Sequence, residues 1–184
     1  MKELDFKKAF KYPFNRPAGM LNILWLFVPV IGWLALFGYT ITIVKHFIKG
    51  DFRKLPKMKF GEHLGLGFFM FLKSIPFMVV YGFLNFILTR SPTAGFFANL
   101  FIAIFFVPIL TVNFFNKETV ASYFEFRKLG AVFNNLWEYI IVMLKSLALG
   151  LIFLLMFLIL VGIPANSFTK NIFIADFYRR RVKK

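Results

Sequence analysis

The sequence of 184 residues contains no cysteine. This absence excludes disulfide bonds, thiolate metal sites and cysteine nucleophiles. Acidic residues are also scarce, with 8 Asp and Glu against 23 Lys and Arg, which gives a formal net charge of +15. No two carboxylates are spaced for acid–base hydrolysis, and no nucleophile lies beside a histidine and an acid. We therefore expect a protein that is not an enzyme and that binds no cofactor.

Histidine is almost absent as well, with His46 and His63 as the two examples. They flank a polar loop of about 16 residues, with Glu62 beside the second, and show no ligand spacing such as HExxH. We therefore expect no metal site.

Apolar residues are abundant, at 59% of the chain with 29 phenylalanines and a mean hydropathy of +0.72. Soluble domains are nearer 45–50% apolar and rarely tolerate the exposed patches that this composition would create. Four long apolar runs cover residues 20–44, 64–88, 95–115 and 137–163. Each is close to or above the length of about 20 residues that spans a bilayer as a helix. The sequence predicts an all-α fold, a polytopic transmembrane helix bundle that forms a single membrane domain over 1–184, in the cell membrane.

Proline and glycine predict interruptions in these helices. Apolar stretches run into proline four times, at Pro29, Pro76, Pro108 and Pro164. A break at Val28-Pro29 with Gly32 beside it favours a broken hairpin in the first run, and one kinked helix is the alternative. Gly65 and Gly67 suggest close contact between helices.

Both ends of the chain differ from the apolar runs. Residues 1–17 place Leu4, Phe6, Ala9 and Phe10 among basic side chains, which predicts an interfacial amphipathic segment. Residues 165–184 are too polar to face lipid, so they predict a returning helix packed against other helices, followed by a basic tail. This return places both termini in the cytoplasm and gives about six crossings, with four or five as the alternatives. Without it, the basic tail would lie outside, against the charge rule.

The basic residues gather in segments that flank the apolar runs, as the positive-inside rule requires. The candidate lipid-facing cluster consists of Lys45, Lys49, Arg53, Lys54, Arg179, Arg180 and Arg181. We expect it to meet the lipid bilayer at anionic lipid headgroups or to hold a partner membrane protein. We expect no nucleic acid, because net charge is the only feature that would favour it.

Four polar residues form a candidate intramembrane site: Lys73, Lys145, Asp176 and Asn113. The two lysines could line a pocket for an anion or a headgroup, countered by Asp176 or Glu138. Alternatively, they extend to the inner interface. Asp176 is expected to pair with Lys170 or a tail arginine, and Asn113 to form a hydrogen bond between helices.

One stretch of sequence resembles a known family. Gly38-Tyr39-Thr40 up to Lys45, then Gly50, then Leu55-Pro56 resemble a signature of the domain of unknown function 4013, an uncharacterised polytopic membrane family. The segment FEFRKLGAVF and the tail IADFYRR are similar to its later segments. The family pattern continues with an acid and a tryptophan after the proline, whereas here Lys57 to Lys59 and then Phe60 follow. The resemblance implies the same architecture and transfers no site.

Two functions remain open at this stage. The first is a scaffold, assembly factor or accessory subunit that binds a partner protein or anionic lipid at its basic cytoplasmic face. The alternative is a transport component for a small solute or lipid that uses the broken helices as its binding site.

Overall fold

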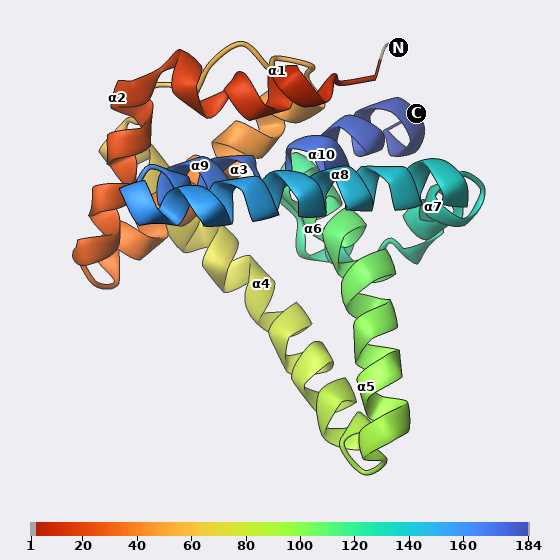
Figure 1. Ribbon diagram of the computed structural model, residues 1–184. Helices are drawn as coiled ribbons and strands as arrows, with labels where there is room; N and C mark the ends of the chain where they lie inside the picture. Colours follow the sequence, from red (N-terminus) through yellow and green to blue (C-terminus); the bar gives the residue numbers. More distant parts are fainter. Residues whose placement is uncertain (1–2, 184) are drawn as a thin grey trace.

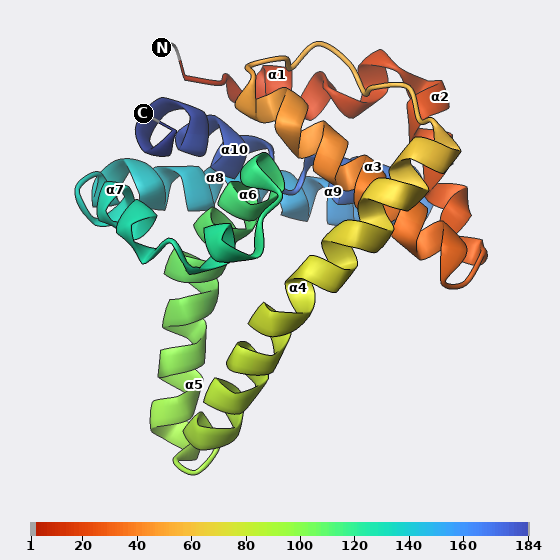
Figure 2. The ribbon, with the colours of Figure 1, turned by 180° about the vertical axis from the view of Figure 1, so that it is seen from behind.

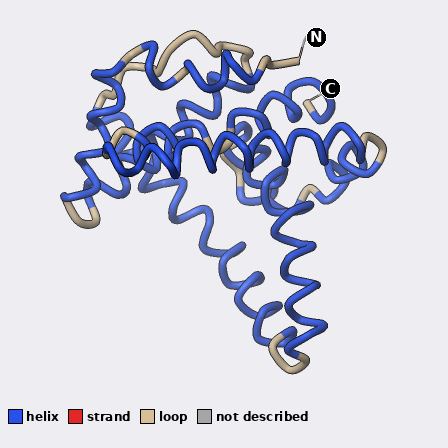
Figure 3. The backbone as a smooth tube through the Cα atoms, viewed as in Figure 1, coloured by secondary structure: helices blue, strands red, loops and turns tan. Residues whose placement is uncertain are grey.

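The computed structural model describes residues 3–183, and every regular element in that range is a helix, with no strand (Figure 3). Four helical segments are long and apolar enough to cross a membrane: Ile31–Ile48, Phe60–Leu88, Pro92–Lys117 and Leu136–Ile159. The predicted all-α membrane fold is therefore confirmed. Figure 1 shows the arrangement of the helices.

The first apolar run is broken into two helical parts. The elements up to this point are α1 (Phe6–Lys11), the 3₁₀ helix η1 (Pro13–Asn15), α2 (Pro17–Met20), the 3₁₀ helix η2 (Leu21–Phe27) and α3 (Ile31–Ile48). The chain reverses at Val28–Val30, where Val30 takes a positive φ of 59°. A Cβ on Gly32 would lie 2.0 Å from the Trp25 carbonyl oxygen, so only glycine permits this close return. The structure thus contains the broken hairpin rather than one kinked helix.

A long hairpin follows and projects from the rest of the molecule (Figures 1 and 2). It consists of α4 (Phe60–Leu88), a turn, α5 (Pro92–Phe101), the π-helical segment η3 (Ile102–Phe106) and α6 (Val107–Lys117). α4 continues through Pro76 without interruption. Pro108 is the second residue of α6 and lies just after the π-helical segment, so the helical span from Pro92 to Lys117 accommodates this proline at a π-helical bulge. Of the four prolines, therefore, only Pro29 and Pro164 lie close to chain reversals.

α3 and α4 cross at two glycines. A Cβ on Gly38 would lie 1.9 Å from the His63 carbonyl oxygen, and one on Gly67 would lie 1.8 Å from the Leu34 carbonyl oxygen. The two backbones therefore touch, as small residues allow in membrane helix pairs. The expected close contact is found at Gly67 but not at Gly65, where a Cβ would meet nothing within 4 Å.

The last third of the chain packs against the helices described so far. It comprises the 3₁₀ helices η4 (Val120–Phe124) and η5 (Phe126–Leu129), α7 (Gly130–Phe133), α8 (Leu136–Leu155), η6 (Met156–Ile159), α9 (Gly162–Thr169), α10 (Ile172–Phe177) and the π-helical η7 (Tyr178–Val182). The reversal comes at Leu160, with φ 59°, and a Cβ on Gly162 would lie 2.0 Å from the Phe153 carbonyl oxygen. The return therefore begins at Gly162, ahead of the boundary expected at residue 165, and Pro164 lies in the first turn of α9.

The returning segment is the most buried part of the molecule. It forms two short helices and a π-helical turn instead of one helix, and these pack against α3, α6 and α8. Ala165, Ile172, Ala175 and Phe177 are all 0% exposed. Among its polar side chains Thr169 and Asp176 are each 1% exposed, so protein encloses them and removes the cost of placing them in lipid, whereas Lys170 remains exposed.

α1 rests on this core, and α8 runs across the base of the α4–α5 hairpin instead of alongside it (Figures 1 and 2). Phe6 stacks on Phe173 at 5.8 Å between ring centroids, and Phe10 stacks on Phe153 at 5.6 Å. The apolar face of α1 is therefore covered by protein, while Lys7, Lys8 and Lys11 point to the outside. Both described ends of the chain lie on the side away from the tip of the hairpin.

Candidate functional site

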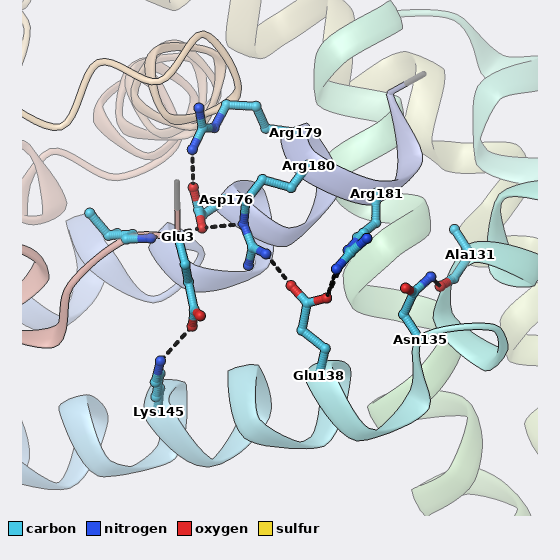
Figure 4. Close-up of polar contacts among 10 residues, drawn as sticks. Glu3, Ala131, Asn135, Glu138, Lys145, Asp176, Arg179, Arg180 and Arg181 are labelled. Carbon is cyan, nitrogen blue, oxygen red and sulfur yellow. Dashed lines mark hydrogen bonds and ion pairs between the residues drawn. The ribbon is translucent and has the colours of Figure 1, made fainter. Parts of the chain in front are cut away.

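The C-terminal tail carries a buried ion network (Figure 4). Asp176 of α10 is 1% exposed and accepts hydrogen bonds from Arg179 Nη2 at 2.6 Å and from Arg180 Nε at 2.8 Å. Arg180 also donates through Nη1 to Glu138 of α8, and Arg181 pairs with the other oxygen of that carboxylate at 2.7 Å. We call these five residues the tail network. It joins the end of the chain to α8.

The tail network also fixes the beginning of the described chain. The backbone amide of Leu4 donates to Asp176 Oδ2 at 3.1 Å. Burial opposes the charge of Arg180, but its hydrogen bonds to Glu138 and Asp176 outweigh that cost and raise its pKa. A guanidinium this well paired is a structural group. The predicted pairing of Asp176 with a tail arginine is what the structure shows.

The other candidate intramembrane residues have separate surroundings. Lys145 pairs with Glu3 at the edge of the molecule, where both side chains are partly exposed. Lys73 Nζ donates to the Glu118 carbonyl oxygen at 2.9 Å, and the Glu118 carboxylate pairs with Lys45. The two lysines therefore do not line one pocket, and neither is paired with Asp176 or Glu138.

Asn113 is 0% exposed and bridges two segments. Its amide donates to the Ser122 carbonyl oxygen at 2.7 Å, and its Oδ1 accepts from the Tyr178 hydroxyl at 2.6 Å. The oxygen and the nitrogen of the side-chain amide both form hydrogen bonds, so Asn113 joins α6 to η4 and to η7. The expected hydrogen bond between helices is present.

The predicted basic cluster divides into two kinds of residue. Arg179, Arg180 and Arg181 belong to the tail network, and Lys45 is paired with Glu118. Arg180, at 9% exposed, is too buried to meet a headgroup. Lys49, Arg53 and Lys54 are exposed on the surface. The prediction placed the tail arginines at the surface, because the composition shows which residues are basic but not which acidic residues they contact in the fold.

A cleft of about 430 Å³ lies between α1 and the segment that follows α3. We call it the basic cleft. Its lining residues are Asp5, Lys7, Lys8, Lys11, Asn15, Phe52 and Arg53. Phe52 is buried beneath it, and the ammonium group of Lys8 lies 6.0 Å from the centre of that ring. The three lysines of α1 were not in the predicted cluster, although the alternation of basic and apolar residues in α1 was the signal that could have placed them there.

Asp5 is the acidic residue that lines the basic cleft, and its carboxylate already forms a hydrogen bond within the first turn of α1. Its carboxylate accepts from the Lys8 amide at 3.2 Å and caps the start of α1. The cleft is therefore lined by four cationic side chains and one carboxylate, and one of the four cations, Arg53, is also ion-paired with Asp51 at 3.2 Å. Such a site is suited to an acidic ligand.

A second cleft, of about 440 Å³, lies between the η2–α3 hairpin and α9. Thr40, Asn166, Ser167 and Lys170 contribute polar groups, and the remaining lining residues are apolar: Ile23, Leu26, Trp33, Leu36, Phe37 and Phe168. We call it the hairpin cleft. Among residues 3–183, no three histidines or acids come close enough to hold a metal ion.

The segment around Gly38 and Leu55 forms one structural unit. The Tyr39 hydroxyl donates to the Pro56 carbonyl oxygen at 2.9 Å, and both Tyr39 and Leu55 are 0% exposed. Gly50 takes a φ of +82° directly after α3, which suits glycine at the end of a helix. The model of a family described as Protein of unknown function (DUF4013) matches residues 21–162. The chain belongs to this family.

In this DUF4013 protein the residues that carry the family resemblance have structural roles. Gly38 allows the contact with α4, Gly50 ends α3, and Tyr39 ties α3 to the following segment through Pro56. No curated protein and no solved structure that was compared matches the chain. The function must therefore be argued from the clefts and charges.

Proposed function

We propose that this protein is a non-catalytic component of the cell membrane that holds an acidic segment of a partner protein in its basic cleft. The observation that carries the proposal is the cleft itself. Two elements that are distant in sequence, α1 and the segment after α3, place four cations along a cleft whose lining includes the buried Phe52 ring. A scaffold, assembly factor or accessory subunit needs such a preformed site and no reactive group.

The position of the basic cleft favours a protein partner over lipid headgroups. α1 lies at the end of the molecule that is farthest from the tip of the α4–α5 hairpin (Figure 1). With that hairpin in the bilayer, α1 faces the aqueous phase, where a soluble segment can reach it. The positive-inside rule assigns this phase to the cytoplasm, and the shared side of both chain ends supports cytoplasmic termini.

Photo-crosslinking in native membranes tests this proposal. A photoreactive residue at Asn15, which lines the cleft, should give a crosslink to an acidic segment of one protein. The triple variant Lys7→Gln, Lys11→Gln, Arg53→Gln should lose most of that product, since it removes three of the four cations that line the cleft. Crosslinks to lipid alone, or a product unchanged in the triple variant, would overturn the proposal.

A matched control keeps the change in net charge constant. Lys49, Lys54 and Lys57 are exposed, and none of them lines the basic cleft. The variant Lys49→Gln, Lys54→Gln, Lys57→Gln should therefore retain the crosslinked product. Equal losses in the two triple variants would show that total charge decides binding and that the cleft does not.

The hairpin cleft supports a second candidate function, the binding of a small polar solute for transport. Asn166 lines it and makes no side-chain hydrogen bond within residues 3–183. A transporter requires water to reach this site, so Asn166→Cys should react with a membrane-impermeant maleimide. Leu158→Cys, at a position 91% exposed on an apolar surface, provides the unreactive lipid-facing control. Protection of both cysteines would exclude transport through this cleft.

A further inference from the structure

An apolar groove of about 260 Å³ opens between α4 and α6. Its lining residues are Phe77, Val80, Tyr81, Leu84, Ile102, Phe106, Val107, Leu110, Phe124 and Phe126. Figures 1 and 2 show α4 and α5 joined at their tip and separating towards the body of the molecule. The groove lies where the two arms have separated.

Fixed contacts at both ends hold the groove open. At the tip, a Cβ on Gly95 would lie 2.2 Å from the Leu88 carbonyl oxygen, so α5 touches the end of α4. At the other end, the rings of Phe77 and Tyr123 stack with centroids 3.8 Å apart. α4 therefore touches α5 at the tip and packs on η4 at the inner end, where the Tyr123 hydroxyl is hydrogen-bonded to Thr111 of α6. Because α4 and α6 are separated between these contacts, the groove is a built feature of the fold.

A charged cleft adjoins the groove at its inner end. We call it the linker cleft: it measures about 720 Å³ and is lined by Lys117, Phe124, Glu125, Phe126, Arg127 and Lys128. Phe124 and Phe126 line both the linker cleft and the apolar groove. The apolar groove and the basic linker cleft are therefore neighbours that share two aromatic side chains.

The charges of the linker cleft favour an anion. Lys117 pairs with Glu125 at 2.6 Å, and Lys128 donates to the Val182 carbonyl oxygen at 3.0 Å. Arg127 is exposed, and its side chain makes no hydrogen bond or ion pair with residues 3–183. After the Lys117–Glu125 pair is counted, two positive charges remain, one of them on a guanidinium suited to a phosphate.

Helix length places the two cavities at different depths. Pro92–Lys117 has 26 residues, so at 1.5 Å per residue it is about 39 Å long, compared with about 30 Å for the hydrocarbon core. With Pro92 at the opposite boundary of the core, Lys117 reaches past the core, while Phe106 to Leu110 remain within it. The basic part of the site lies at headgroup level, and the apolar part lies at the level of the acyl chains.

We propose that the apolar groove and the linker cleft together bind one anionic phospholipid, with an acyl chain between α4 and α6 and the phosphate at Arg127. This lipid site is separate from the basic cleft and shares no residue with it. The lipid would fill the groove between α4 and α6, which no side chain of residues 3–183 fills.

Native mass spectrometry of the purified, delipidated protein tests the proposal. Titration with phosphatidylglycerol and with phosphatidylcholine of equal chain length should show one lipid per chain and a preference for phosphatidylglycerol. Arg127→Gln should weaken phosphatidylglycerol binding about fivefold, the effect of one basic residue at a membrane surface. It should weaken phosphatidylcholine binding less, because the choline cation offsets the charge of the phosphate. Val80→Trp should remove the bound lipid of either kind, because the indole fills the groove.

Each variant has a matched control in the same chain. Val79 is 65% exposed on the same helix but does not line the groove, so Val79→Trp should retain the lipid. Arg53→Gln removes a cation from the basic cleft and should also retain it, which separates this test from that of the proposed function. Val80 is itself 53% exposed, so its replacement does not disturb the core.

Three outcomes would overturn the lipid site. The first is equal binding of the two phospholipids, and the second is equal loss in Val79→Trp and Val80→Trp. The third is binding of glycerol phosphate as tightly as phosphatidylglycerol. This result would show that the linker cleft binds an anion and that the apolar groove contributes nothing to binding.

Discussion

At the scale of single residues, the deepest charges in this protein are already paired. Asp176 and Arg180 are almost fully buried, and each has a partner of opposite charge. Paired buried ions of this kind add little net stability compared with apolar residues, but removal of one partner leaves the other without compensation. The tail network should therefore be sensitive to single substitutions while it takes no part in binding.

Asp176→Asn tests this expectation. The substitution keeps the shape of the side chain but leaves Arg180 with Glu138 as its remaining carboxylate, and it weakens the hydrogen bond from the Leu4 amide. We expect a loss of about 3 kcal/mol in the free energy of unfolding, measured in detergent by thermal unfolding. Lys145→Gln breaks the partly exposed pair with Glu3 and should cost less than about 1 kcal/mol. Equal effects of the two substitutions would contradict the structural role of the tail network.

The sequence anticipated one part of this network. Asp176 and the tail arginines are three and four residues apart, which a helix brings together, so their pairing could be predicted. Glu138 and Arg180 are 42 residues apart, and Glu3 and Lys145 are 142 apart. No periodic pattern links such pairs. The partners of the basic residues therefore become visible only once the helices are packed.

At the scale of helices, the contact between α3 and α4 depends on glycine. Gly38 and Gly67 lie where the two backbones meet, and a Cβ at either would overlap a carbonyl oxygen. The apolar pattern predicted two helices here but not their crossing point, because small residues also occur where no contact exists. Gly65, two positions from Gly67, is such a case.

Gly67→Ala and Gly65→Ala form a matched pair. At Gly67 the added methyl group must separate α3 from α4, so we expect a loss of about 1–3 kcal/mol in the free energy of unfolding. At Gly65 the methyl group meets open space, and alanine favours a helix by up to about 1 kcal/mol over glycine. Thermal unfolding of both variants in the same detergent compares them. A more stable Gly67→Ala variant would show that the crossing is looser than the structure indicates.

The end of α3 should respond to acid. Burial opposes ionisation of Asp51, but hydrogen bonds and the charge of Arg53, together with His46, outweigh it and lower the pKa of the carboxyl group. The stabilising contribution is complete above the unfolded pKa of about 3.9 and is lost as the pH falls through the lower native pKa. The protection factors of the amides of residues 46–55, which correct the exchange rates for their intrinsic pH dependence, should therefore fall in that acid range. Asp51→Asn should exchange faster at neutral pH and show no further change in acid.

At the scale of the whole molecule, the hairpin of α4 and α5 projects away from a body that carries both ends of the chain (Figures 1 and 2). Four apolar segments were evident from composition, and four helices of sufficient length are present. Their arrangement was not evident, because hydropathy measures how apolar a helix is and not how it is tilted. The segment Leu136–Ile159, which begins with α8, has the highest mean hydropathy of the four. α8 nevertheless runs across the base of the hairpin instead of beside it.

This arrangement predicts which parts of the chain are accessible from each side of the membrane. Ser91 lies in the turn between α4 and α5. The segment between α3 and α4, which contains Lys54, and the C-terminal end of the chain, which contains Lys183, lie at the opposite end of the molecule (Figure 1). Because the chain has no native cysteine, single cysteines can be introduced without background. In intact cells, Ser91→Cys should react with a membrane-impermeant maleimide, whereas Lys54→Cys and Lys183→Cys should react only after permeabilisation. Labelling of Lys183→Cys in intact cells would place the tail outside, and protection of Ser91→Cys under both conditions would mean that the hairpin enters the bilayer without crossing it.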